Sequence, residues 1–148
     1  MKHILIATDG SPASARAVEA GVELAAERGG EVTFVHVVPP DEWVGGRGAP
    51  SRPLPHHVAI DEGETALEEA AQAAEAAGVS CALERIAGDP VDEILAVAEA
   101  KDVDLVVVGS RGRGAVTSAI LGSVSLDVVK RARCPVLVVK DVSAPVEA

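Results

Sequence analysis

Five short apolar segments alternate along the chain with longer stretches of helical character, and this alternation limits the possible folds more than any other feature. The segments are 4–7, 32–38, 80–86, 104–108 and 135–139. Strands that alternate with helices indicate a parallel sheet with helices on both faces, because parallel strands need crossover connections. The last two segments lack the polar alternation of half-exposed strands, which is typical of strands buried on both faces. We therefore predict an α/β fold with a doubly wound parallel sheet, in one domain that spans residues 1–148.

Local signals mark the ends of two helices. Ser11 followed by Pro12 is typical of an N-cap and a first helical position, and Asp89–Pro90 repeats this pattern. Gly29–Gly30 predicts the end of the first helix. These signals place helices directly after the first and third apolar segments.

The region between the second and third apolar segments is divided by composition. An alanine- and glutamate-rich stretch predicts a helix from about Ile60 to Ala77. In 39–58 Pro, Gly and Arg dominate, so we expect a mobile loop that serves as a lid or stays disordered. Trp43 covers either a base or apolar surface, and His56–His57 is interpreted as a solvated pair because no third metal ligand follows at a suitable spacing. We expect 141–148 to form a tail.

A glycine-rich segment follows the fourth apolar segment. Gly109, Gly112 and Gly122 stand in the spacing Gly-x2-Gly-x9-Gly, and Ser123 follows directly. Glycine lets the backbone approach an anion closely, and the free amides at a helix N-terminus favour negative charge. Ligands of doubly wound sheets bind beyond the carboxyl ends of the strands, where the strand order reverses. If the first and fourth strands are neighbours, Asp9 and Gly109 face one crevice, which would suit a nucleotide.

The charge distribution favours a small anionic ligand over nucleic acid. The formal net charge is −10, and one Phe, one Trp and no Tyr leave few stacking platforms for single strands. Residues 109–140 nevertheless carry six Lys or Arg and one Asp. Within this segment Arg111 and Arg113 are either phosphate contacts or solvated charges.

The remaining polar candidates have simpler interpretations. His36 lies within an apolar strand, so we expect a hydrogen-bonded core histidine rather than a ligand. Asp9 either caps the following turn or contributes to the site. Cys81 and Cys134 are predicted to be buried thiols, since two distant cysteines do not indicate a disulfide framework. No signal peptide or membrane-spanning run is evident, so we expect a cytoplasmic protein.

The glycine spacing, together with three other segments, resembles the universal stress protein family. These are Ile4-Leu-Ile-Ala-Thr-Asp-Gly-Ser11, Val35-His-Val-Val38 and Arg133-Cys-Pro-Val-Leu-Val-Val139. The resemblance extends from about residue 2 to residue 140. It implies a five-stranded sheet of order 3-2-1-4-5, an adenine nucleotide such as ATP, ADP or AMP as ligand, and dimerisation. The complete glycine pattern resembles that of the ATP-binding members.

The resemblance also implies roles for individual residues. Ala7, Thr8 and Asp9 would border the adenosine, and Val37 would offer main-chain groups to the base. Val108 and Gly109 would line the ribose-phosphate side. The phosphates would lie against Arg111, Gly112, Gly122, Ser123, Val124 and Ser125. The Ser123 and Ser125 hydroxyls would add donors there or help to hold a divalent ion such as Mg²⁺.

Three functions remain open on the sequence. The first is a nucleotide-binding stress or signalling module with little or no catalysis, and the second is a slow ATPase or nucleotidyl-transfer enzyme. The third is an interaction or scaffold domain with an empty cleft. Neither a Gly-x4-Gly-Lys-Ser/Thr loop nor a local catalytic set is present, which favours the first. A dinucleotide-binding domain is disfavoured because the chain reads Asp9-Gly-Ser-Pro12 where Gly-x-Gly-x-x-Gly is expected.

The final strand predicts self-association. In the expected strand order it lies at an edge of the sheet, and apolar edge strands tend to pair with a second chain. We therefore predict a homodimer through Val136, Leu137, Val138 and Val139.

Overall fold

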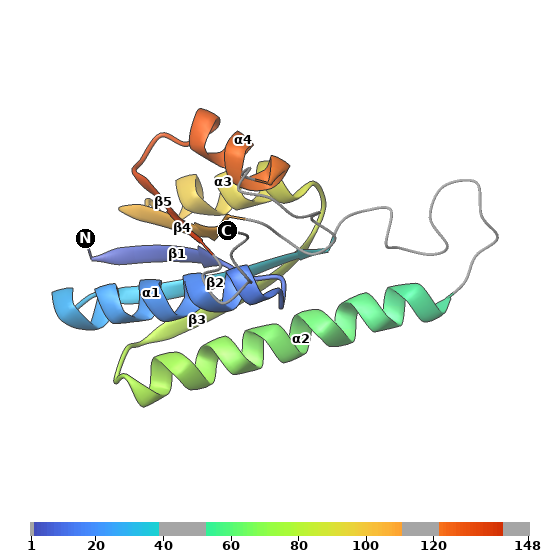
Figure 1. Ribbon diagram of the computed structural model, residues 1–148, viewed down its shortest axis with the longest axis horizontal. Coiled ribbons are helices and arrows are strands. Elements are labelled where there is room, and N and C mark those ends of the chain that lie inside the picture. Colours follow the sequence, from blue (N-terminus) through green and yellow to red (C-terminus); the bar gives the residue numbers. More distant parts are fainter. Residues whose placement is uncertain (1, 39–52, 111–121, 141–148) are drawn as a thin grey trace, which may run out of the picture.

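A five-stranded parallel sheet forms the centre of the computed structural model, which describes residues 2–38, 53–110 and 122–140, with side chains of the second range described from residue 63. The sheet has the order β3-β2-β1-β4-β5, and each strand pair is parallel (Figure 1). Its strands are β1 (His3–Ala7), β2 (Glu31–Val38), β3 (Cys81–Ala87), β4 (Leu105–Gly109) and β5 (Val136–Val139). The predicted doubly wound topology is confirmed.

Four helices of the described chain cover the two faces of this sheet (Figure 1). They are α1 (Pro12–Arg28), α2 (Pro53–Ala76), α3 (Pro90–Ala100) and α4 (Ser123–Arg131). One core cluster joins β-strand side chains such as Ile4 and Ile6 to α1 and α2, and a second joins Leu5 to α3 and α4. Successive residues of a strand point to opposite faces, so this division follows directly from the sequence period of two.

The depth of burial differs between the central and the edge strands. Ile4, Leu5 and Ile6 in β1 and Val107 in β4 are fully buried, as expected for strands covered on both faces. The same expectation is wrong for β5, where Leu137 is 37% exposed. An edge strand has a neighbour on one side only, so a single chain leaves part of it uncovered.

The predicted helix ends are confirmed. The side chain of Ser11 accepts a hydrogen bond from the amide of Ser14 at 3.2 Å, and that of Asp89 accepts one from the amide of Asp92 at 2.9 Å. Gly29 ends α1 in the left-handed conformation at φ 66°. These caps satisfy terminal backbone groups that would otherwise lack partners.

The start of α2 corrects the predicted loop. The helix begins at Pro53, not near Ile60, so the expectation of a loop was wrong over 53–58. Proline is tolerated in a first helical turn because the amides there have no intrahelical acceptor, and Pro53 and Pro55 both fall in that turn. The rest of the expected loop, 39–52, and the expected tail lie outside the described residues.

The cysteines correct a second expectation. Cys81 is exposed and Cys134 is only partly buried, so neither is the fully buried thiol that we predicted. Cys81 opens β3, an edge strand whose side chains are largely exposed. Partial burial, aided by Glu75, raises the pKa of the Cys81 thiol.

Among the helices of the described chain, none has the length and apolarity required to cross a membrane.

Candidate functional site

The candidate site lies where the strand order reverses between β1 and β4. The two strands pair in parallel as far as Ile6 and Val107, so Ala7 and Val108 each follow the last register pair. Beyond β1 the chain enters α1 on one face of the sheet, and α4, which follows β4 in the chain, lies on the other. β1 and β4 are therefore neighbours, which is the condition under which we expected Asp9 and Gly109 to face one crevice, and such a position is where doubly wound sheets bind ligands.

The structure describes most of the predicted site residues. Described are Ala7, Thr8, Asp9, Val37, Val108, Gly109, Gly122, Ser123, Val124 and Ser125, whereas Arg111 and Gly112 lie outside the described residues. Thr8, Val108 and Ser125 are buried, while Ser123 is exposed. Trp43 lies outside the described residues, and the side chains of His56 and His57, which belong to α2, are not described.

The turn after β1 is built from short polar side chains. Asp9 Oδ1 accepts a hydrogen bond from the Ser11 amide at 2.9 Å, and the Asp9 amide donates to Ser14 Oγ at 3.2 Å. Gly10 supplies the left-handed conformation at φ 83°. The Asp9 carboxylate thus shapes its own turn, as one of its two interpretations required. A direct contact of Asp9 with a ligand stays a prediction.

Gly109 lies against helix α1, a contact that the sequence did not indicate. Its backbone does not adopt the left-handed conformation. A Cβ at Gly109 would instead lie 2.7 Å from the carbonyl carbon and 2.8 Å from the carbonyl oxygen of Ala13. The first turn of α1 therefore lies directly against the end of β4, and the absent side chain permits this approach.

The start of α4 is fastened to the end of β4. The Gly122 amide donates to the Ser110 carbonyl at 2.6 Å. Ser125, only 3% exposed, donates through its hydroxyl to the carbonyls of Ser110 at 3.1 Å and Gly122 at 3.0 Å. A hydroxyl has one hydrogen, so Ser125 has no donor left for a phosphate. The sequence led us to expect such a donor, whereas the structure gives this hydroxyl a positioning role.

The first turn of α4 presents its backbone amides without a side-chain cap. The N-cap residue is Gly122, and no described side chain takes the place of a cap. In α1 and α3, by contrast, Ser11 and Asp89 provide one. Free amides and the positive end of the helix dipole make such a terminus suitable for an anion. The predicted phosphate position is therefore chemically reasonable at Ser123 and Val124.

The main chain of Val37 faces the same edge of the sheet. The Thr8 amide donates to the Val35 carbonyl at 2.9 Å, and the Gly88 amide donates to the Val38 carbonyl at 3.0 Å. Main-chain groups of successive strand residues point to opposite neighbours, so those of Val37 point the way of Val35, toward β1. Because β1 ends at Ala7, opposite Val35, the groups of Val37 lie beyond the last paired residue.

His36 is the core histidine that we expected. Its side chain is 3% exposed, and Nδ1 lies 2.9 Å from the Thr8 carbonyl oxygen. The sequence did not indicate that the ring would contact the turn at the candidate site. It also did not single out Ser14 or Ser110, whose buried polar groups fasten the two loops; short polar residues next to strand ends were the available signal.

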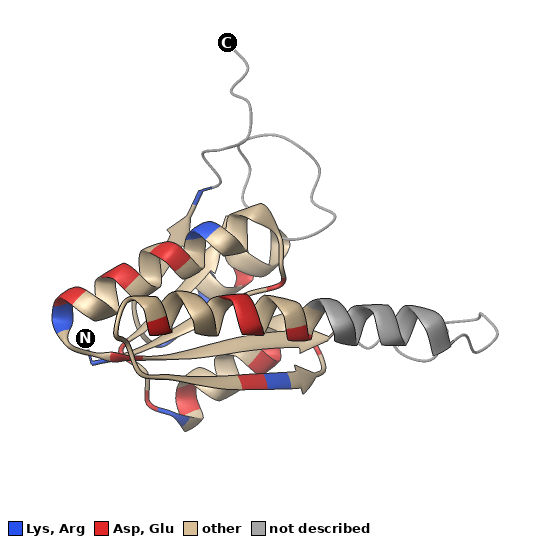
Figure 2. Cartoon of the chain, turned by 90° about the horizontal axis from the view of Figure 1, so that it is seen from below, with Lys and Arg blue, Asp and Glu red and all other residues tan. Residues whose placement is uncertain are grey.

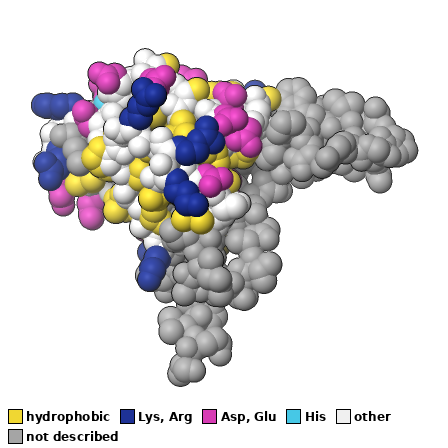
Figure 3. Space-filling view, turned by 90° about the horizontal axis from the view of Figure 1, so that it is seen from above, with side chains coloured by type: hydrophobic (Ala, Val, Ile, Leu, Met, Phe, Trp, Pro, Cys, Tyr) yellow, Lys and Arg dark blue, Asp and Glu magenta, His cyan; other side chains and the backbone are white. Residues whose placement is uncertain are grey.

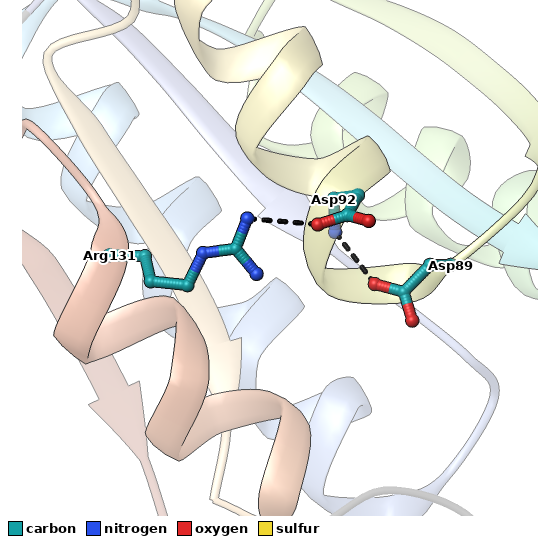
Figure 4. Close-up of polar contacts among 3 residues, drawn as sticks. All are labelled: Asp89, Asp92 and Arg131. Atoms are coloured by element: carbon teal, nitrogen blue, oxygen red, sulfur yellow. Dashed lines mark hydrogen bonds and ion pairs between the residues drawn. The ribbon is translucent and has the colours of Figure 1, made fainter.

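The basic excess of 109–140 is partly neutralised. Arg131 donates to Asp92 of α3 at 2.9 Å (Figure 4), and Arg133 lies 3.5 Å from Glu99. Basic, acidic and apolar side chains are interspersed on the face shown in Figure 3, whereas acidic residues are spaced along α1 and α2 in Figure 2. The predicted electrostatic attraction therefore depends on fewer cations than the sequence count suggests.

No group of three or more His, Cys, Asp or Glu side chains within the described part of the chain could hold a metal ion. A divalent ion would therefore need ligands other than such a cluster, and phosphate oxygens are the usual ones. Mg²⁺ stays a prediction.

The topology and the loops define a doubly wound α/β protein. The start of α4 is suited to an anion and lies at the carboxyl end of the sheet, where the strand order reverses between β1 and β4. The chain belongs to the universal stress protein family, whose model matches residues 1–140. A universal stress protein of Methanocaldococcus jannaschii is 39% identical over 139 residues, covering 94% of this chain and 82% of that protein.

Two solved structures resemble the chain over almost their full length. A universal stress protein in complex with cAMP has a TM-score of 0.71 at 29% identity, covering 93% of this chain and 96% of that one. The universal stress protein from Archaeoglobus fulgidus in complex with dAMP has a TM-score of 0.68 at 25% identity, covering 95% and 98%. Both proteins therefore carry an adenine nucleotide on a closely similar fold.

Proposed function

We propose that this chain binds an adenine nucleotide, ATP in particular, at the carboxyl edge between β1 and β4, and acts as a stress-response module with little or no catalysis. The observation that carries the proposal is the start of α4, which no described side chain caps and which the Gly122–Ser110 hydrogen bond holds against the end of β4. Binding of cAMP and dAMP by two structural relatives supports the same ligand class.

Each part of the nucleotide has a suitable partner in this proposal. The phosphates take the amides of Ser123 and Val124 as donors, and the buried Ser125 hydroxyl keeps those amides in place. The ribose lies between Asp9 and Gly109. The base uses the main-chain groups of Val37, which point beyond the end of β1. Ala7, Thr8 and Val108 complete the walls, and Arg111 and Gly112 are assigned to the phosphate side from the family pattern alone.

Weak catalysis follows from the way in which the site's polar groups are used. Phosphoryl transfer needs a positioned attacking group and groups that stabilise the developing charge. The Ser125 hydroxyl donates its only hydrogen within the fold, and Asp9 Oδ1 accepts from the Ser11 amide. We therefore expect Mg²⁺, bound through phosphate oxygens, to accompany ATP without supporting rapid turnover.

We further propose that the protein is a homodimer through β5. Leu137 on this strand is 37% exposed, and Leu126 and Val129 on the neighbouring α4 are 40% and 44% exposed. An edge strand beside exposed apolar side chains favours a second copy of the same strand as its partner.

Two measurements test the nucleotide proposal. Nucleotides released from protein purified without added ligand are identified by mass spectrometry, and ATP, ADP, AMP and cyclic AMP are titrated calorimetrically. We expect an adenine nucleotide in the first measurement and saturable binding in the second. If no nucleotide copurifies and none binds, the chain is better described as an interaction domain. Rapid release of phosphate during incubation with ATP and Mg²⁺ would instead favour the alternative that the chain is an ATP-hydrolysing enzyme.

A further inference from the structure

His36 donates a hydrogen bond to the main chain of the candidate site from within the core. Its Nδ1 lies 2.9 Å from the Thr8 carbonyl oxygen, and the side chain is 3% exposed. A carbonyl oxygen can only accept, so Nδ1 must carry the hydrogen. This contact selects the Nδ1–H form of the imidazole in the neutral ring.

The contact fixes the position at which β1 ends. The last register pair between β1 and β2 is Ala7 with Val35. Both main-chain polar groups of Thr8 bind β2. Its amide donates to the Val35 carbonyl at 2.9 Å, and its carbonyl accepts from the His36 side chain. The imidazole therefore extends the connection by one residue before the chain turns toward Asp9.

The turn itself depends on Thr8. Thr8 Oγ1 lies 3.3 Å from Ser14 Oγ, which also accepts from the Asp9 amide at 3.2 Å. Asp9 in turn holds the Ser11 amide. A displacement of Thr8 would therefore move the Asp9 turn, which borders the proposed nucleotide. The residues of the turn itself would be unchanged.

Helix α2 supports the imidazole from the other side. A Cβ at Gly63 would lie 2.2 Å from His36 Cδ2 and 2.5 Å from Nε2. Only glycine at this position leaves room for the ring in its present place, because a Cβ atom does not approach a non-bonded atom this closely in proteins. Gly63 thus connects α2 to the Thr8 turn through one side chain.

We propose that His36, supported by Gly63, is a positioning residue for nucleotide binding: it fixes the Thr8 carbonyl and so places the Asp9 turn beside the ligand. The inference rests on the proposed function. It assigns the affinity of the site partly to a buried side chain that does not itself contact the nucleotide.

Variants with matched controls separate positioning from general stability. His36→Leu removes the donor, whereas His36→Asn retains a side-chain N–H near the position of Nδ1. Thr33→Val is the control, because Thr33 is 1% exposed on the same strand and bonds His3 Nε2 at 2.8 Å near the opposite end of β2. ATP affinity is measured by calorimetry and stability by thermal unfolding.

We expect His36→Leu to weaken ATP binding about tenfold, as the loss of one buried hydrogen bond allows, and His36→Asn to stay within about twofold of wild type. Thr33→Val should lower Tm and leave the affinity unchanged. Equal affinity in wild type and His36→Leu would overturn the inference, and so would an equal loss in Thr33→Val. If the wild-type chain binds no nucleotide, the proposed function itself fails and this role fails with it.

A second pair of variants covers the case in which His36→Leu does not fold. Gly63→Ala and Gly21→Ala each add one methyl group to a helix, and each new Cβ meets a core side chain, His36 at 2.2 Å or Ile6 at 2.3 Å. Gly63→Ala should weaken ATP binding, whereas Gly21→Ala should change stability alone. The reverse order would contradict the inference. Nitrogen NMR shifts of His36 in the free protein should show Nδ1 protonated, and the opposite tautomer would also contradict it.

Discussion

The main-chain amide of Gly122 donates to the carbonyl of Ser110 at 2.6 Å, although residues 111–121 separate the two in the chain. The start of α4 therefore lies against the end of β4. The same carbonyl accepts from the buried Ser125 hydroxyl. Strand end and helix start therefore form one fixed unit, and the proposed phosphate position is part of it.

Ser125→Ala should destabilise the fold more than a typical surface substitution. It removes the hydrogen that the Ser110 and Gly122 carbonyls share, and we expect the free energy of unfolding to fall by about 1 kcal/mol. Urea unfolding measures this change. Ser123→Ala, at an exposed position one residue after the N-cap, is the control and should stay within about 0.5 kcal/mol of wild type. Equal stability of both variants would show that the Ser125 hydroxyl does not fasten α4.

Gly109→Ala should disturb the contact between β4 and α1. The new Cβ would lie within 3.0 Å of Ala13, including its backbone, and we expect a loss of about 2 kcal/mol because a backbone shift is needed. Gly78→Ala is an informative control, since that site has open space but a φ of 72°. It should cost about 1 kcal/mol through backbone strain and leave ATP affinity unchanged, whereas Gly109→Ala lowers both stability and affinity. A fully stable Gly109→Ala would contradict the close approach.

The sequence predicted the local features of the fold better than the contacts between its elements. The caps Ser11 and Asp89 and the alternation of strands and helices follow from local pattern. The strand order that makes β1 and β4 neighbours came from the family resemblance. The contact of Gly109 with Ala13 and the acceptors of the Ser125 hydroxyl depend on how elements pack, which local sequence does not encode. The start of α2 was placed too late because Pro53 suits both a loop and a first helical turn.

Asp104 should make stability depend on pH in the acid range. The amides of His3 at 3.0 Å and Lys2 at 2.8 Å hold the pKa of its carboxyl below its usual range. A folded-state pKa below the unfolded value gives stability that is present above the unfolded pKa, about 4, and lost as pH falls through the folded value. Asp104→Asn should thus be less stable than wild type at neutral pH, and urea unfolding should show this difference shrinking below about pH 4. A difference that stays constant with pH would contradict the assignment.

Leu137→Arg should prevent dimer formation. A charge on the exposed face of β5 opposes the proposed pairing of two β5 strands. Leu83→Arg is the matched control, because Leu83 is 46% exposed on β3, the opposite edge of the sheet. Sedimentation velocity should give a dimer for wild type and Leu83→Arg and a monomer for Leu137→Arg. A dimer that survives Leu137→Arg and is lost in Leu83→Arg would move the interface to β3.

Titration of wild type and Gly122→Asp with ATP tests the central claim most directly. Gly122 has φ −67° and ψ 162°, a conformation open to any residue, so aspartate can cap α4 and place its own carboxylate where the phosphates are proposed to bind. We expect saturable binding of ATP to wild type and a loss of about 100-fold in affinity for Gly122→Asp, with stability unchanged or slightly raised. The neutral control Gly122→Asn should lose less. Equal ATP affinity in wild type and a folded Gly122→Asp would contradict a phosphate site at the start of α4.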